Sequence, residues 1–167
     1  RAVTFMHDGV STDGYLTLSD DPDALYTQIK FRDMKTKEHV ILPAEGALID
    51  LKLAELLDLK VGDTLEIDAG TRFRVQVAGI VEHYVYHYAY LSSENYEALT
   101  GEKRLPNEYL VTCADTSDEA ISDLSEQLMA LDGVQSVSNL VAMARSFRET
   151  MEVVDAAVLI IILSAAA

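Results

Sequence analysis

Several stretches in the first half of the chain alternate between hydrophobic and polar side chains, the pattern of β-strands with one buried face. In the clearest case, Phe73, Val75 and Val77 alternate with polar residues after a turn at Ala69-Gly70. This alternation, or a short apolar run between turn residues, predicts strands at 3–7, 15–18, 27–33, 39–42, 64–68 and 71–82. Turn-rich stretches at 9–14 and 19–23, the second acidic, separate the earliest of these strands.

Leucines recur at helical spacing in residues 47–59 (ALIDLKLAELLDL), which predicts a short amphipathic helix before the turn at Gly62-Asp63. Together, the strands and this helix predict a β-rich, barrel-like lobe over residues 14–91.

The second half of the chain has a different pattern. Residues 92–99 (SSENYEAL) predict a short helix with an N-terminal capping serine, ending at Gly101. Predicted strands at 108–114 and 134–140 flank a helix over 116–131, which carries apolar residues on one face. We therefore expect residues 92–139, together with the N-terminal strand, to form a small α/β lobe. The predicted fold class is α+β with two lobes, and we expect residues 1–139 to form one domain ahead of the long C-terminal helix.

Residues 140–167 predict one long helix without Gly or Pro. It begins with mixed polar and apolar residues, but from Val153 to Ala167 only Asp155 and Ser164 are polar. A buried terminal helix and the first part of a membrane-spanning helix, which needs about 20 apolar residues, both fit this composition. The gradient from amphipathic to apolar favours a stalk that enters a bilayer, with the span only begun at Ala167.

Composition and motifs narrow the function. A net charge of −15 and a pI near 4.4 would repel nucleic acid and anionic lipid headgroups. The single cysteine, Cys113, excludes an internal disulfide and fits a buried structural thiol. The acidic stretch 20–23 lacks the pattern of a calcium loop. The sequence has no nucleotide-binding, hydrolase or metalloprotease motif and no paired CxxC, so its motifs predict no catalytic, cofactor or metal site.

Residues 82–90 (EHYVYHYAY) form the most unusual stretch. On a helix, His83 and His87 would converge on one metal ion, but on a strand they lie about 13 Å apart, too far to share it. The Tyr and Val content favours a strand, continuous or broken near Val85. Two interpretations stay open for this stretch, packing in the core or between lobes and a partner surface, and its candidate residues are Tyr84, Tyr86, His87, Tyr88 and Tyr90.

Three segments in order resemble the extracytoplasmic domain of FtsX-like ABC transporter permeases, related to the MacB-like periplasmic core. They are residues 45–67, with the K-x-G-D turn and a strand; 77–101, with V-x-G-I followed by Y-x-x-H-Y-x-Y-L-S; and 146–167, the apolar helix. The tyrosine motif matches at Tyr84, His87, Tyr88, Tyr90, Leu91 and Ser92. The opening of the α/β lobe, expected just after a preceding membrane helix, is not evident.

The resemblance implies a non-enzymatic subunit in the cell membrane, with this domain on the extracytoplasmic side. Its partners would be a cytoplasmic ABC ATPase, a second permease copy or a paralogue, and an envelope protein or peptide. The exported substrate would be a peptide, a lipid or a lipoprotein. The alternatives are an extracytoplasmic sensor or binding module that uses the tyrosine-rich face, and a hydrolase or metal enzyme, for which no nucleophile–base set is visible.

Overall fold

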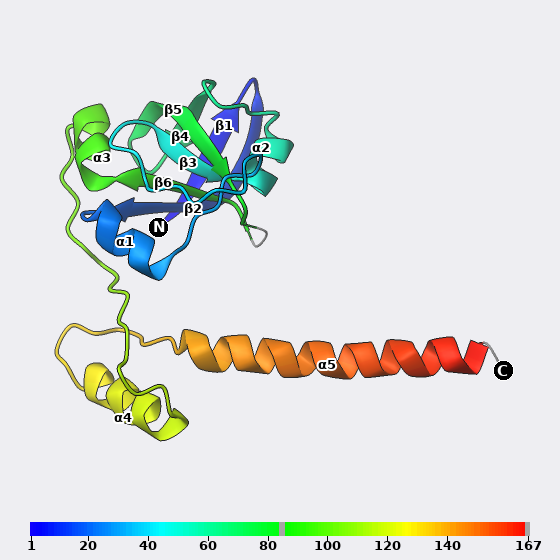
Figure 1. Cartoon of the computed structure of the whole chain (residues 1–167). Helices are drawn as coiled ribbons and strands as arrows, with labels where there is room; N and C mark the ends of the chain where they lie inside the picture. The colour runs from blue at the N-terminus through cyan, green and yellow to red at the C-terminus, as the bar shows by residue number, and fades with distance from the viewer. Residues whose placement is uncertain (84–85, 166–167) are drawn as a thin grey trace. The chain divides into compact units, whose positions relative to one another are not determined.

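The computed structural model describes residues 1–83 and 86–165, in two compact units, Arg1–Leu110 and Val111–Ala167 (Figure 1). The first unit contains a closed six-stranded barrel with strand order β1-β2-β6-β3-β5-β4. The fold is therefore α+β with a barrel lobe, as predicted. Its strands are β1 (Ala2–His7), β2 (Val10–Ser19), β3 (Ala47–Asp50), β4 (Thr64–Asp68), β5 (Arg72–Val81) and β6 (Tyr88–Ser92).

The barrel mixes parallel and antiparallel pairs. β2 pairs with β6, and β3 with β5, in parallel, while the other neighbours are antiparallel. The N-terminal strand was expected in the α/β lobe, but β1 pairs with both β2 and β4. That expectation was wrong, because β1 is needed to close the barrel, and closure leaves no unpaired edge between the first and last strands.

Two hydrophobic clusters hold this unit together. The first fills the barrel, because alternate residues of each strand point inward, and it includes Phe5, Ile49, Leu65, Ile67 and Leu91. The second cluster lies on the outer face of the barrel. Outward-facing strand residues Leu48, Val81 and Tyr90 pack there against Leu25, Phe31 and Leu42 of the segment between β2 and β3.

The cover of the outer face differs from the prediction. Strands expected at 27–33 and 39–42 are not formed: α1 (Pro22–Gln28) is followed by irregular chain with isolated bridges at Arg32–His39 and Asp33–Val81. Asp21 caps α1 by accepting a hydrogen bond from the backbone N–H of Ala24 at 2.9 Å, and Pro22 suits the first helical turn. The acidic turn is thus a helix start, and the apolar residues after it pack onto the barrel without joining the sheet.

The prediction of a helix at 47–59 is correct only for its middle part, Leu51–Leu56. Residues 47–50 form β3, which is buried at all four positions between β5 and β6, and α2 (Leu51–Leu56) starts after it. A short apolar run fits a buried strand as well as a helix, so periodicity did not separate the two. The predicted strands at 64–68 and 71–82 are confirmed as β4 and β5.

The helix predicted to end at Gly101 is confirmed as α3 (Ser93–Thr100). The Ser92 hydroxyl accepts a hydrogen bond from the Asn95 backbone N–H at 3.1 Å and donates to the Ala44 carbonyl at 3.2 Å. The Asn95 side chain donates to the Gly46 carbonyl at 3.2 Å. The cap of α3 therefore also fixes the chain that leads into β3.

The second unit contains α4 (Asp118–Met129) and α5 (Leu140–Ala165). The strands predicted at 108–114 and 134–140 are not formed, so the β-α-β unit is not present there. A strand needs a partner, and β1, the strand expected to provide one, has both edges occupied in the barrel. Within the unit, Arg145 on α5 forms an ion pair with Asp118 on α4. In the part of the chain that is described, no helix reaches the length and apolarity needed to cross a membrane.

A close approach at Gly14 leads to the first prediction. A Cβ atom at this buried position in β2 would lie 2.5 Å from the His87 carbonyl oxygen and 2.6 Å from the Phe5 ring. Gly14→Ala is therefore expected to lower the free energy of unfolding by about 1–3 kcal/mol in urea unfolding, because backbone and a packed ring must move. Gly79→Ala is the control, since its Cβ would meet only the end of the Leu48 side chain at 2.9 Å. An equal or larger loss at Gly79 would contradict the explanation.

Candidate functional site: a tyrosine ladder on the barrel

A row of aromatic rings crosses β2 and β6 on the outside of the barrel. The two strands run in parallel side by side (Figure 1). Their register places Tyr15 opposite Tyr88. These two rings stack with centroids 5.4 Å apart, and Tyr88 stacks on Tyr90 at 5.9 Å because residues two apart on a strand share a face. We call these three rings, together with those of His83 and Tyr86, the tyrosine ladder (Tyr15, His83, Tyr86, Tyr88 and Tyr90).

One end of the ladder is buried. Tyr90 is 4% exposed and packs edge-on against Phe31 with centroids 4.7 Å apart. Its hydroxyl lies 3.1 Å from Nδ1 of His83, and the His83 ring stacks on Tyr88 at 4.9 Å. This end is core packing, one of the two interpretations that the sequence left open.

The other end is exposed. Tyr86 is 68% exposed and Tyr15 is 40% exposed, and their rings meet edge-on with centroids 6.0 Å apart. A single exposed aromatic ring is ordinary, whereas two adjoining exposed rings that continue a stack offer a contact area. Core packing and an exposed surface are therefore both present along the same row of rings.

The structure places the predicted residues unevenly. Tyr86, Tyr88 and Tyr90 belong to the ladder, and Tyr84 lies outside the described residues. His87 does not join the rings: its backbone carbonyl accepts a hydrogen bond from the Tyr15 N–H at 2.8 Å. The Nδ1 atom of His87 is buried without a hydrogen-bond partner among the described residues.

The strand predicted over 82–90 is not continuous, although Val85, near which a break was expected, lies outside the described residues. β5 ends at Val81, β6 starts at Tyr88, and Tyr86 has a positive φ of 60°. This break lets the His83 ring stack on Tyr88, although strict alternation would put these two residues on opposite faces. Sequence analysis also missed Tyr15, because no local pattern reveals the parallel pairing of β2 with β6.

Asp50 fixes the start of β6 beneath the ladder. Its carboxylate is fully buried, and one oxygen accepts a hydrogen bond from the Leu53 backbone N–H at 2.9 Å, which caps α2. The other oxygen accepts a hydrogen bond from the Tyr88 backbone N–H. One carboxylate thus links β3, α2 and the first residue of β6.

The phenols of the ladder resist ionisation. Burial raises the pKa of Tyr90 well above its ordinary value of 10.0, with smaller contributions from Tyr88 and Asp50. Burial also raises the pKa of Tyr88, followed by the effects of Tyr15 and the Glu108 carboxylate. The folded ladder therefore favours neutral phenols in a negatively charged surrounding.

This shift predicts a loss of stability at alkaline pH. Because the folded-state pKa of Tyr90 is raised, its contribution is complete below the unfolded value of about 10 and is lost as the pH rises toward the folded value. Tyr90→Phe is expected to reduce this alkaline loss, measured as the free energy of unfolding at neutral pH and above pH 10. Tyr109→Phe, at a side chain that is 79% exposed, is the control and should leave the loss unchanged. An unaltered loss in Tyr90→Phe would contradict the assignment.

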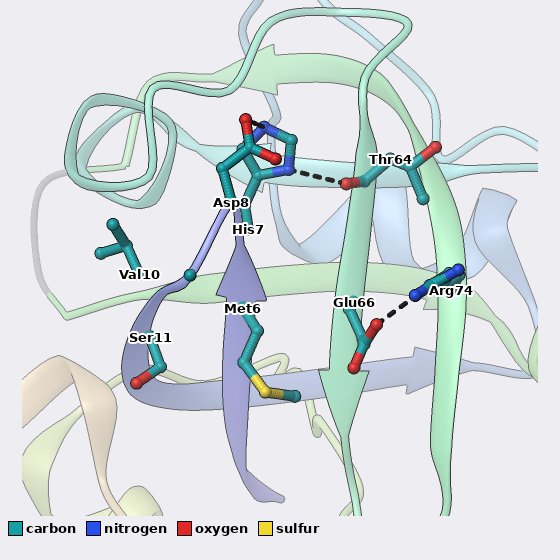
Figure 2. A pocket seen from close by; sticks show the side chains of 9 residues that line it. Met6, His7, Asp8, Val10, Ser11, Thr64, Glu66 and Arg74 are labelled. Carbon is teal, nitrogen blue, oxygen red and sulfur yellow. Dashed lines mark hydrogen bonds and ion pairs between the residues drawn. The ribbon is translucent and has the colours of Figure 1, made fainter.

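A hollow of about 660 Å³ lies beside the β1–β2 turn, and Figure 2 shows that its ionic groups bind one another. Arg74 donates to Glu66 at 2.9 Å, and the His7 ring lies 3.0 Å from the Thr64 carbonyl and 3.7 Å from the Asp8 carboxylate. These contacts supply no nucleophile–base pair. Within residues 1–83 and 86–165, no group of three or more His, Cys, Asp or Glu side chains is placed to hold a metal ion.

A second polar cluster fastens the chain after α3 to the barrel. The Arg104 guanidinium donates to the Tyr96 hydroxyl at 3.1 Å and to the Glu102 carboxylate at 2.7 Å. Glu102 also accepts a hydrogen bond from the Thr71 hydroxyl, which is the main cause of its lowered pKa. Since these groups satisfy one another, the cluster is structural, and the tyrosine ladder is the candidate site.

No protein-family model matches this chain, and no curated protein matches it.

Proposed function

We propose that this chain is the extracytoplasmic part of an ABC transporter permease subunit in the cell membrane. It would relay ATP-driven motion to the export or extraction of a peptide, lipid or lipoprotein, or to an envelope partner. The observation that supports the proposal is the length and composition of α5. Its 26 residues, Leu140–Ala165, contain no Gly or Pro, and their composition changes from mixed polar and apolar to apolar along the helix. Such a helix is stiff, and it suits a stalk between a folded domain and a bilayer.

The positions of the family-like segments support the proposal. Residues 45–67 include β3, α2 and β4, residues 77–101 include the end of β5, β6 and α3, and residues 146–167 cover most of α5. The K-x-G-D piece falls at the turn before β4, where Gly62 has a positive φ of 99°. The K-x-G-D motif thus coincides with a turn, where a glycine has a physical use, whereas the V-x-G-I motif lies within β5.

In this proposal the barrel unit and the unit around α4 are two lobes of one outer domain, and α5 is the lever that joins them to the membrane. Side chains along α5 fit this role, because Met143, Phe147 and Val158 are 63%, 66% and 47% exposed. The partners would be a cytoplasmic ATPase and a second permease copy or a paralogue, with α5 packed on neighbouring helices or lipid.

The test is the location of the native full-length protein. We expect it to stay in the membrane fraction after an alkaline carbonate wash. We also expect Cys113, which the structure leaves partly exposed and not buried as the sequence predicted, to react with a membrane-impermeant maleimide in intact cells, once any other cysteines are replaced. Cys113→Ser is the matched control and should lose the label. Release by the carbonate wash, or labelling only after lysis, would contradict the proposal.

A second candidate function is an extracytoplasmic sensor or binding module that uses the tyrosine ladder. It is favoured by one observation, the exposure of Tyr15 and Tyr86 at the open end of the stack. A protein released by the carbonate wash that still binds an envelope peptide through these residues would support this function over the first.

A further inference from the structure

We infer that the exposed end of the tyrosine ladder binds an arginine-bearing peptide segment of a partner protein, through stacking of guanidinium groups on the phenol rings. The inference names a ligand class for the ladder and does not depend on the transport role. It rests on the geometry of the rings and on the charge that surrounds them.

The geometry provides open ring area. Tyr15 and Tyr86 meet edge-on, so their faces point in different directions, with an interplanar angle of 83°. Tyr15 in turn stacks on Tyr88, which holds it in place on the sheet. Cations bind best over the face of an aromatic ring, and a planar guanidinium also stacks on it.

The charge around the rings is negative. Asp13 lies two residues before Tyr15 on β2, so its exposed carboxylate shares the outer face, where it accepts a hydrogen bond from the Thr4 hydroxyl at 2.9 Å. Glu108 lies close enough to Tyr88 to raise the pKa of its phenol. The whole chain has 28 Asp and Glu against 13 Lys and Arg, so a cationic segment is the complementary partner.

The same unit already holds a cation over a tyrosine. Nζ of Lys30 lies 4.2 Å from the ring centroid of Tyr26 on α1. Tyr26 is thus a matched internal control, a tyrosine whose face is covered by a cation of the chain itself.

The experiment measures peptide binding to the purified chain. The probe is a short peptide of alternating arginine and glycine, and its control replaces each arginine with citrulline, which is neutral and of similar shape. Because the sequence contains eight Tyr and no Trp, quenching of tyrosine emission reports on the rings, and calorimetry gives Kd. We expect the arginine peptide to bind at least about tenfold more tightly than the citrulline peptide at low salt.

Variants separate ring contacts from general charge attraction. The double variant Tyr15→Leu/Tyr86→Leu is expected to weaken binding of the arginine peptide about tenfold, since two cation–ring contacts are lost. Tyr86→Phe keeps the ring and should bind like the wild type, and Tyr26→Leu should also leave Kd unchanged. Glu108→Gln should weaken binding about twofold to threefold. The far-ultraviolet circular dichroism spectrum of each variant checks that it is folded.

Three results would overturn the inference. They are equal binding of the citrulline peptide, an unchanged Kd in the folded double variant, and binding of phosphatidylcholine vesicles in place of the peptide. The last would mean that the rings recognise a lipid headgroup. Each result is obtained on the isolated chain, so it is independent of whether the full-length protein passes the membrane test.

Discussion

Asp50→Ala is expected to lower the free energy of unfolding of the barrel unit by about 3 kcal/mol. The Asp50 side chain is 0% exposed, and its two oxygens accept hydrogen bonds from the backbone N–H groups of Leu53 and Tyr88. Alanine would remove the cap of α2 and leave the buried Leu53 N–H and the partly buried Tyr88 N–H without this acceptor. A buried group without its partner loses the full energy of desolvation, which is larger than the net gain of an ordinary hydrogen bond.

Urea unfolding of the whole chain would measure this effect, and Asp21→Ala is its matched control. Asp21 also caps a helix, with a 2.9 Å hydrogen bond from the Ala24 N–H, but its cap is exposed to water. Asp21→Ala should therefore lower the free energy of unfolding by only about 1 kcal/mol. Asp50→Asn should fall between the two, because the amide oxygen can still cap α2 while its NH₂ group opposes the Tyr88 N–H. Equal losses in the two alanine variants would show that burial is not the cause.

Insertion of a Gly-Pro pair after Thr150 in the full-length protein is expected to abolish transport. Under the proposed function α5 acts as a lever, and Thr150 lies in its interior, where its hydroxyl donates to the Ser146 carbonyl at 2.8 Å. Proline removes a backbone donor and clashes with the preceding turn, which destabilises the helix by about 3 kcal/mol or more. Glycine adds a point at which the backbone bends freely. Motion from the membrane would then bend the helix instead of moving the outer domain.

Two measurements separate this effect from misfolding. Transport is assayed with the full-length permease and its ATPase, while urea unfolding of the isolated chain carrying the same insertion should remain that of the wild type. Thr150→Ala keeps the helix continuous and should retain transport. Transport that survives the Gly-Pro insertion would count against the lever.

Local chemistry made several elements predictable. Strict alternation identified β4 and β5, and the serine and glycine that bound α3 marked both of its ends. The segments 47–50 and 108–114 were misassigned for one shared reason. Each is a short apolar run, and whether such a run becomes a strand depends on a neighbouring strand that lies elsewhere in the chain. Residues 47–50 pair with β5 and β6, whereas residues 108–114 do not form a strand in the described structure.

The tyrosine ladder divides in the same way. Alternation placed Tyr86, Tyr88 and Tyr90 on one face from their spacing alone, because the side-chain period of extended chain is two. Tyr15 and His83 joined them only through the parallel register of β2 with β6 and the break after Val81. Burial then separated the row into a packed end at Tyr90 and an open end at Tyr86.

By itself, the sequence determined the acidic charge, which follows from composition alone. It also determined the strands with one solvent-exposed face, the capped helices and the apolar gradient of residues 140–167, because these depend on neighbours within a few positions. Only the tertiary structure decided that β1 closes the barrel, that Asp50 links α2 to β6, and that part of the tyrosine row faces solvent. Those features depend on contacts between residues distant along the chain, and the backbone pairing that creates them is specified by the fold as a whole.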